Sequence, residues 1–349
     1  MGIFRRSKIE ASSSLTSGDV GAATLLTAAA TTVAGRDRAM RIPTISRARD
    51  LLCSLAASLP LQHFSYSWAT GAYVETELAP EPWMLRPDTK TTLAHTLGWT
   101  VDDLLFHGRA AWRITSRRML DGRPASFEWL PASDLNVVAQ YYAGGVPLGD
   151  YSVTFAGTPV PLSDLVMFWS PIAPLLDTAA RGILVAERLD QSALRFASTP
   201  TAFGYLQQTG GEPMTSDELS DLAQGWIASR DTQSVGALNE WVEWKESQMS
   251  PDKLQLVESR QHQALELSRL ANVPPYLLGA PTGSGMTYQN AQQSRQDLIL
   301  FGALPYLEVI QQTLSGDAVT PRGHLVRFDT NAWTDHLPGT TPTPPAGTP

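Results

Sequence analysis

The chain has 349 residues and a formal net charge of -8; 43% of its residues are hydrophobic and 17% are charged. This length allows one large domain or two to three small ones, with enough apolar material for a buried core. The acidic balance argues against tight nucleic-acid binding, because such affinity comes from Lys and Arg that neutralise phosphates. The low charge content fits large subunit interfaces, whose centres are depleted of charge.

Residues 1–40 are rich in Ser, Thr, Ala and Gly, so we expect an N-terminal arm that is flexible or ordered only on neighbouring molecules. Its basic residues Arg5, Arg6 and Lys8, followed by the apolar stretch 22–34, imitate a secretion signal. Threonines dilute that stretch, and we favour the arm. No part of the sequence predicts a transmembrane helix.

The segment 41–181 mixes helical and strand patterns. Apolar residues recur at helical spacing from Thr44 to Leu59, and Pro60 ends the run. A second helix is expected at about 91–106, with Gly108 after it. Alternating apolar residues predict strands at 111–114, 127–131, 135–138, 151–155 and 164–169. Together these elements predict an α+β module.

The middle of the chain predicts two helices and an aromatic segment. Apolar spacing predicts a helix over 183–203, and the Gly-rich stretch 209–213 then breaks the chain. Thr215 or Ser216 is expected to cap the next helix, whose first acidic residues complement the helix dipole. The segment ends in an aromatic run at 241–244.

A long amphipathic helix is expected over 252–272, and its polar residues form one stripe. On a helical wheel they fall within an arc of about 80°; they are Gln255, Glu258, His262, Glu266 and Arg269. One interpretation is a solvated face supported by pairs one turn apart. The other is a face toward a water-filled channel, with the apolar face on neighbouring subunits.

Prolines determine where this helix stops. Pro274 and Pro275 lack backbone donors and disfavour helix in the residues before them, so the helix must end near Asn272. The polar stretch 281–290 predicts an exposed loop, and helical spacing returns at 292–314. Pro305 removes the backbone hydrogen bond to Phe301 in this last helix, which predicts a kink.

No motif predicts catalysis, a metal site or a cofactor. The glycines at 283 and 285 lack the Lys and the preceding strand of a phosphate-binding loop. The six histidines show no metal-ligand spacing, and no Gly-x-Ser-x-Gly elbow is present. Cys53 is the single cysteine and lies in the apolar run 51–55, so we expect a buried, inert thiol.

Several phrases of the sequence closely resemble the tailed-bacteriophage portal (head-to-tail connector) family, of the long-tailed phage type. They are Leu-Ala-Asn-Val-Pro-Pro-Tyr-Leu-Leu-Gly at 270–279, Thr-Tyr-Gln-Asn-Ala-Gln-Gln-Ser at 287–294 and Ala-Ala-Ser-Leu-Pro-Leu at 56–61. The order of elements over about 40–335 is similar as well. One departure is Arg109, which stands where the family often has Asn.

The resemblance implies an α+β portal fold with an α/β wing, a two-helix stem, a small α/β clip and a reduced or absent crown. It divides the chain into arm 1–40, wing 41–181, first stem helix 182–204, clip 205–250, second stem helix 251–279, tunnel loop 280–294, kinked helix with returning wing strand 295–336, and disordered tail 337–349.

The resemblance also implies a function without catalysis or cofactor. The expected protein is a homododecameric ring at a unique capsid vertex, assembled in the host cytoplasm and kept in the virion. The terminase large subunit would drive double-stranded DNA through it without sequence specificity, and the DNA would later be ejected through it. Head-tail adaptors, major capsid protein and scaffold protein are the other expected partners, and no membrane is involved. Another virion component, such as a head-completion or tail protein, is the alternative, and a soluble hydrolase is a more distant one.

Site residues follow from the same resemblance. The polar stripe of the 252–272 helix is expected to face the channel. Pro274, Pro275 and Pro305 mark the helix break and kink, and Trp226, Trp241 and Trp244 are expected to face clip partners. The tunnel-loop residues expected near DNA are Thr282, Gly283, Ser284, Gly285, Met286, Thr287, Tyr288, Gln289, Asn290 and Arg295.

Overall fold

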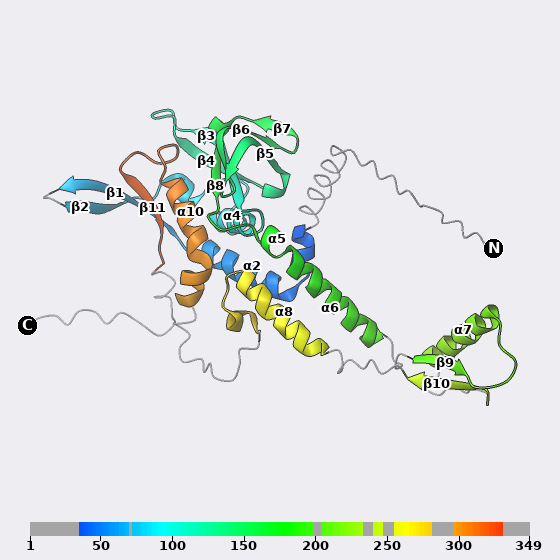
Figure 1. Ribbon diagram of the computed structural model, residues 1–349. Helices are drawn as coiled ribbons and strands as arrows, with labels where there is room; N and C mark the ends of the chain where they lie inside the picture. Colours follow the sequence, from blue (N-terminus) through cyan, green and yellow to red (C-terminus); the bar gives the residue numbers. More distant parts are fainter. Residues whose placement is uncertain are drawn as a thin grey trace, which may run out of the picture. The chain divides into compact units, whose positions relative to one another are not determined.

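A computed structural model describes residues 35–69, 72–198, 204–232, 240–246, 255–280 and 296–330 (Figure 1). Its contacts divide the chain into two units. The larger unit combines Met1–Arg181 with Leu267–Pro349, and the smaller unit is Gly182–Glu266. Helices and antiparallel strands are mixed throughout, as predicted for an α+β fold. The expected tail 337–349 lies outside the described residues.

Helix α2 (Pro43–Ser58) begins and ends at prolines, as its sequence predicts. Pro43 stands at the start of the helix, where its fixed φ suits the first turn, and Pro60 follows the end. The buried residues recur every three to four positions and form one face. They are Ile45, Ala48, Leu52, Cys53, Leu55 and Ala56.

Helix α4 (Leu93–His107) has a cap at each end. The Thr92 side chain accepts a hydrogen bond from the backbone N–H of His95. Gly108 ends the helix at φ 68°, and a Cβ there would lie 2.9 Å from Cγ of Pro174. Any residue other than glycine would therefore suffer both a disfavoured backbone conformation and a clash.

Two three-stranded antiparallel sheets follow α4 in the chain. One has the order β4-β3-β8 and the other β5-β6-β7. At the first sheet, the buried ring of Trp112 on β3 contacts the buried rings of Phe127 on β4 and Phe168 on β8. The strands are β3 (Arg109–Arg117), β4 (Pro124–Leu130), β5 (Leu135–Ala143), β6 (Val146–Phe155), β7 (Thr158–Val160) and β8 (Leu165–Trp169).

A third sheet joins the two ends of the described chain. Strand β1 (Leu61–Ala69) lies between β2 (Ala72–Leu78) and β11 (His324–Phe328), and Leu61 pairs with Phe328. Both neighbours of β1 are antiparallel to it. A returning strand was predicted within 295–336, but its pairing with β1 was not.

The smaller unit contains most of helix α6 (Ala180–Ser198), the paired strands β9 (Gly204–Gln208) and β10 (Val242–Glu246), and helix α7 (Ser216–Thr232). Thr215 caps α7, as predicted. Its hydroxyl accepts from the N–H of Glu218, and the Glu218 carboxylate accepts from the N–H of Thr215. This reciprocal pair is a capping box.

Helix α8 (Leu256–Leu270) ends before the two prolines. Asn272 adopts the left-handed conformation with φ 55°, and the N–H groups of Asn272 and Val273 donate to the carbonyls of Arg269 and Ser268. This is a Schellman motif, in which asparagine takes the position usually held by glycine. Val273 and Leu267, which occupy the positions of the apolar contact in this motif, are both buried.

The last helical run, described from residue 296, contains a π-helical segment near its start. Residues Leu298–Ala303 are π-helical, and helix α10 (Leu304–Leu314) continues from them. Pro305 therefore lies in the first turn of α10, not in the middle of a uniform α-helix. The short helices α3 (Pro82–Leu85) and α5 (Leu175–Thr178) complete the labelled elements. No helix within the described ranges is long and apolar enough to cross a membrane.

Candidate functional site

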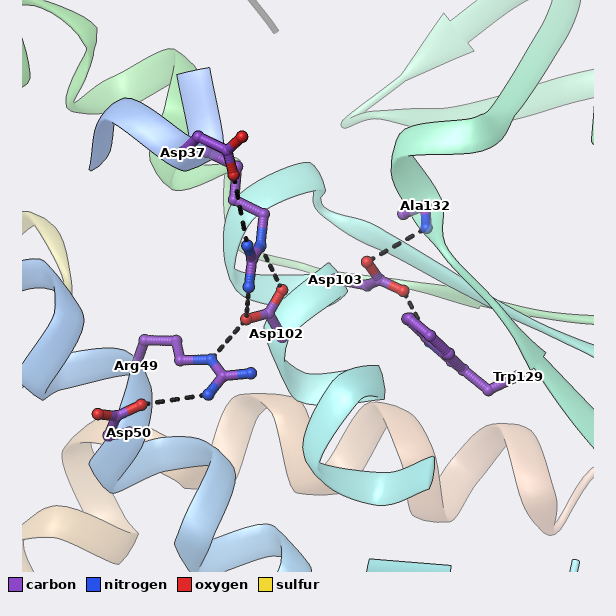
Figure 2. Close-up of polar contacts among 8 residues, drawn as sticks. Asp37, Arg49, Asp50, Asp102, Asp103, Trp129 and Ala132 are labelled. Atoms are coloured by element: carbon purple, nitrogen blue, oxygen red, sulfur yellow. Dashed lines mark hydrogen bonds and ion pairs between the residues drawn. The ribbon is translucent and has the colours of Figure 1, made fainter. Parts of the chain in front are cut away.

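Asp102 on α4 binds two arginines that are distant in sequence. Arg36 donates two hydrogen bonds to its carboxylate, of 2.9 and 2.8 Å, and Arg49 donates one of 2.6 Å. Figure 2 shows the approach of Arg49 from α2. The Asp102 side chain is 1% exposed, so almost no water screens these ion pairs. The Trp99 ring lies beneath both guanidinium groups, 5.2 Å from Arg36 and 4.9 Å from Arg49.

This cluster corrects the expected extent of the N-terminal arm. The arm was predicted to reach residue 40, but residues 35–40 are helical and Arg36 is bound to Asp102 of the same chain. Helical structure is thus present before the predicted boundary at residue 40. Residues 1–34 of the arm lie outside the described part of the structure.

Asp103, the next residue on α4, faces the opposite direction (Figure 2). Its carboxylate accepts from the indole N–H of Trp129 at 2.8 Å and from the backbone N–H of Ala132 at 3.2 Å. Burial nevertheless raises the pKa of Asp103 to about 8, because loss of water disfavours its charged form more than the two hydrogen bonds favour it. The two adjacent aspartates therefore have different roles.

Stability should depend on pH through Asp103. The carboxyl group loses its proton near pH 4 when unfolded and near pH 8 when folded, so the folded state binds more protons between these values. Its contribution to stability should be present below pH 4 and lost as the pH rises to 8. Asp103→Asn, which does not titrate, should show a shallower fall in urea midpoint from pH 5 to pH 8. A parallel pH dependence in both proteins would contradict this assignment.

The polar stripe predicted for α8 is exposed along most of its length. Glu258, His262 and Arg269 are exposed, and Glu266 is half-buried. Gln255 precedes the helix at φ 47°, and its carbonyl accepts the first helical hydrogen bond from Ser259. It is therefore an end residue and not a member of a helical face.

Other residues of α8 contact α6, and Figure 1 shows the two helices side by side. Arg260 forms an ion pair of 2.7 Å with Asp190, and the Gln263 side chain donates to the carbonyl of Gly182 at 3.0 Å. Apolar side chains remain exposed on both helices, with Leu194 68% and Val257 69% exposed. Polar contacts therefore hold the two helices together, while some of their apolar side chains stay exposed.

The three tryptophans expected to face clip partners differ in their surroundings. Trp226 on α7 and Trp244 on β10 contact each other, with ring centroids 5.6 Å apart. Trp241 is 49% exposed and covers Gly210, where an added Cβ would lie 2.2 Å from the indole ring. The Trp226–Trp244 contact joins helix to strand, so these two residues have a packing role that the sequence did not indicate.

Gly210→Ala should displace the Trp241 ring, because the methyl group and the indole cannot both keep their places. We expect a loss of about 1–3 kcal/mol in the stability of the 204–246 segment, measured by hydrogen exchange and tryptophan fluorescence. Gly225→Ala is a matched control, since nothing lies within 4 Å of its added Cβ and it sits within α7. The control should gain about 0.5–1 kcal/mol. Equal stability of the two variants would contradict the packing of Trp241 on Gly210.

Of the predicted tunnel loop 280–294, residues 281–294 lie outside the described residues, including Tyr288, and so does Arg295. The residues on either side are described. Pro275–Leu278 forms a short 3-10 helix, and Pro274 precedes it. Helical structure is described again from residue 296.

Sequence reasoning missed several polar contacts between distant residues. His63 and His324 share a hydrogen bond of 2.9 Å although they are 261 positions apart. The Asp102 cluster was also missed, because Arg36 and Arg49 lie 66 and 53 positions before Asp102. Cys53 is buried, as predicted, and burial raises the pKa of its thiol to about 12. Within the described ranges, no group of three or more His, Cys, Asp or Glu is placed to hold a metal ion.

The fold is similar to that of known portal structures. An HK97 family phage portal protein from Corynebacterium diphtheriae aligns with a TM-score of 0.69 and 26% identity, over 87% of this chain and 98% of that one. A protein in the neck of the native gene transfer agent particle, 18% identical, shares the fold with a TM-score of 0.60, over 88% of this chain and 85% of that one. The architecture is thus that of a portal or neck protein of phage-like particles.

Sequence comparison agrees with the fold. The model of the phage portal protein family matches residues 43–337. The probable portal protein of Streptomyces phage phiC31 is 30% identical over 107 residues, a match that spans 28% of this chain and 22% of that relative. The chain belongs to the phage portal protein family, and the resemblance seen in its sequence is confirmed.

Proposed function

We propose that this protein forms the portal ring at a unique capsid vertex, through which a terminase packages DNA and from which the DNA is later ejected. The observation that carries the proposal is the family match over 43–337 together with a fold that covers 98% of a known portal protein. The protein would work by geometry, with no catalytic residue and no cofactor.

We propose the same division of the chain into domains as the sequence predicted. The wing would be 41–181, the stem 182–204 and 251–279, the clip 205–250 and the tunnel loop 280–294, with the kinked helix and returning strand at 295–336. The ties between α6 and α8 at Asp190–Arg260 and Gly182–Gln263 support a paired stem. The clip would bind terminase and later head-tail adaptors, while capsid and scaffold proteins would surround the ring.

Exposed apolar side chains support assembly into a ring. Met119 and Leu120, at the tip of the β3–β4 hairpin, are 104% and 100% exposed. The hairpin is braced there, because Arg118 donates to both oxygens of Glu81 and Arg123 donates to the carbonyl of Thr320. A rigid apolar tip loses little conformational entropy when a neighbouring subunit covers it. Twelvefold closure is proposed from the C12 symmetry reported for the gene transfer agent neck.

The charge of the chain supports a channel that does not retain DNA. The expected stripe toward the bore includes Glu258 and Glu266, whose carboxylates repel phosphates, beside His262 and Arg269. DNA held by many Lys and Arg contacts would be bound tightly at low salt. A wall of mixed charge allows the duplex to slide.

Native mass spectrometry with negative-stain imaging tests the ring. We expect a closed ring of a single subunit number, and a protein that stays monomeric under every assembly condition would refute the proposal. Met119→Ser with Leu120→Ser should leave the urea midpoint of the monomer unchanged, because surface substitutions alter stability by about 0.5 kcal/mol or less. The double variant should form a smaller fraction of closed rings than the wild-type protein. Rings at the wild-type yield would exclude the hairpin tip as a subunit contact.

A further inference from the structure

Pro305 leaves one backbone carbonyl of the last helical run without its usual donor. In an α-helix the carbonyl of Phe301 would accept from residue 305, but proline has no N–H. The preceding turn is π-helical, and the N–H of Leu304 donates to the carbonyl of Ile299, five residues back. This geometry takes up one extra residue, and the Phe301 carbonyl cannot receive the N–H that residue 305 would supply in a regular α-helix.

A side chain from another segment supplies the donor. The amide nitrogen of Asn272 donates to the Phe301 carbonyl, from a position 29 residues earlier. Asn272 can reach it because it is the left-handed residue that ends α8. Gly302 lies beside this contact: an added Cβ would be 3.5 Å from the Asn272 carbonyl, an ordinary contact distance, and 3.1 Å from the side chain of Leu52 on α2. Asn272 thus has two roles: its backbone ends α8, and its side chain donates to the carbonyl of Phe301 in the π-helical segment.

A second hydrogen bond joins the same two segments. The Tyr276 hydroxyl donates to the Asp297 carboxylate at 2.8 Å. Tyr276 lies in the 3-10 helix after the Asn272 turn, and Asp297 directly precedes the π-helical segment. The two bonds therefore connect the chain just before residue 281 with the chain just after residue 295.

We propose that Asn272 and Tyr276 form a clamp that holds the end of α8 and the start of the π-helical segment as one rigid base. In this clamp the side chain of Asn272 replaces the backbone donor that Pro305 removes. The hydroxyl of Tyr276 holds Asp297, and with it the start of the π-helical segment, in place. The residues just before 281 and just after 295 then belong to one base whose two halves move together. The inference concerns the subunit itself and does not depend on the proposed ring.

Hydrogen exchange of the full-length chain tests the clamp. Asn272→Gly keeps the left-handed conformation but removes the donor, so the amides of Leu304, Tyr306 and Leu307 should exchange about fivefold faster, as expected for one lost hydrogen bond. In a Pro305→Ala background residue 305 can donate to Phe301, and the same substitution should change these rates little. An equal effect in both backgrounds would overturn the role of Asn272.

Further variants separate the clamp from general loss of structure. Asn272→Asp keeps the size of the side chain without the donor and should also speed exchange at 304–307. Tyr276→Phe should do so more weakly, while Tyr205→Phe, an exposed tyrosine on β9, should not. Unchanged exchange in Asn272→Asp and Tyr276→Phe would refute the clamp. These exchange rates can be measured whether the chain is monomeric or assembled. A protein that forms no ring can therefore still support or refute the clamp.

Discussion

Replacing Asp102 by alanine is expected to lower the free energy of unfolding of the larger unit by about 3–5 kcal/mol. The substitution removes the shared carboxylate of Arg36 and Arg49, whose side chains are 23% and 18% exposed. Two cations would then remain close together in a largely dry environment. It would also release the helical residues 35–40, which Asp102 binds through Arg36.

Urea unfolding and hydrogen exchange of residues 35–58 measure this effect. Asp37→Ala is the matched control, because Asp37 also lies near Arg36, at 3.9 Å, but its side chain is 78% exposed. An exposed ion pair of this kind contributes about 0–1 kcal/mol. If both alanine variants unfold at the same urea concentration, Asp102 does not hold the cluster together.

Trp112→Ala should be comparably severe, at about 3–5 kcal/mol. The indole ring is fully buried, and its centroid lies 5.4 Å from that of Phe127 and 5.0 Å from that of Phe168. Its N–H donates to the hydroxyl of Thr100 on α4 at 2.8 Å. Truncation would leave a cavity between strand β3 and helix α4. The Thr100 hydroxyl would lose the indole donor but keep its own hydrogen bond to the Thr96 carbonyl.

Trp112→Phe separates the two losses. Phenylalanine keeps most of the ring volume but cannot donate to Thr100, so the expected cost is about 1–3 kcal/mol. Denaturant titrations followed by far-UV circular dichroism would rank the three proteins. A phenylalanine variant as unstable as the alanine variant would assign the effect to the hydrogen bond and not to packing.

Local chemistry made much of the fold predictable. Pro43, Pro60 and the apolar spacing between them locate α2, and Thr215 with Glu218 locates the start of α7. These signals act within a few residues of one another, so a single sequence contains them. The phrase at 270–279 was specific enough to identify the family.

Contacts between distant residues were not predictable in the same way. Nothing near Arg36 indicates that its partner is Asp102, 66 positions later, because any exposed carboxylate could pair with it. The same holds for Asn272 and Phe301, where the missing donor at Pro305 was visible but its replacement was not. Sequence reasoning also did not show that β10 brings Trp244 beside Trp226 of α7.

The sheet β11-β1-β2 has a consequence for synthesis of the chain. Strand β1 is synthesised well before its neighbour β11, because residues 70–323 lie between them in the chain. At the usual speed of translation, the interval between the two is on the order of 10–50 s. During that time β1 has an unpaired edge, a known site of aggregation. Nascent chains of this protein should therefore depend on cellular chaperones until residue 328 has emerged.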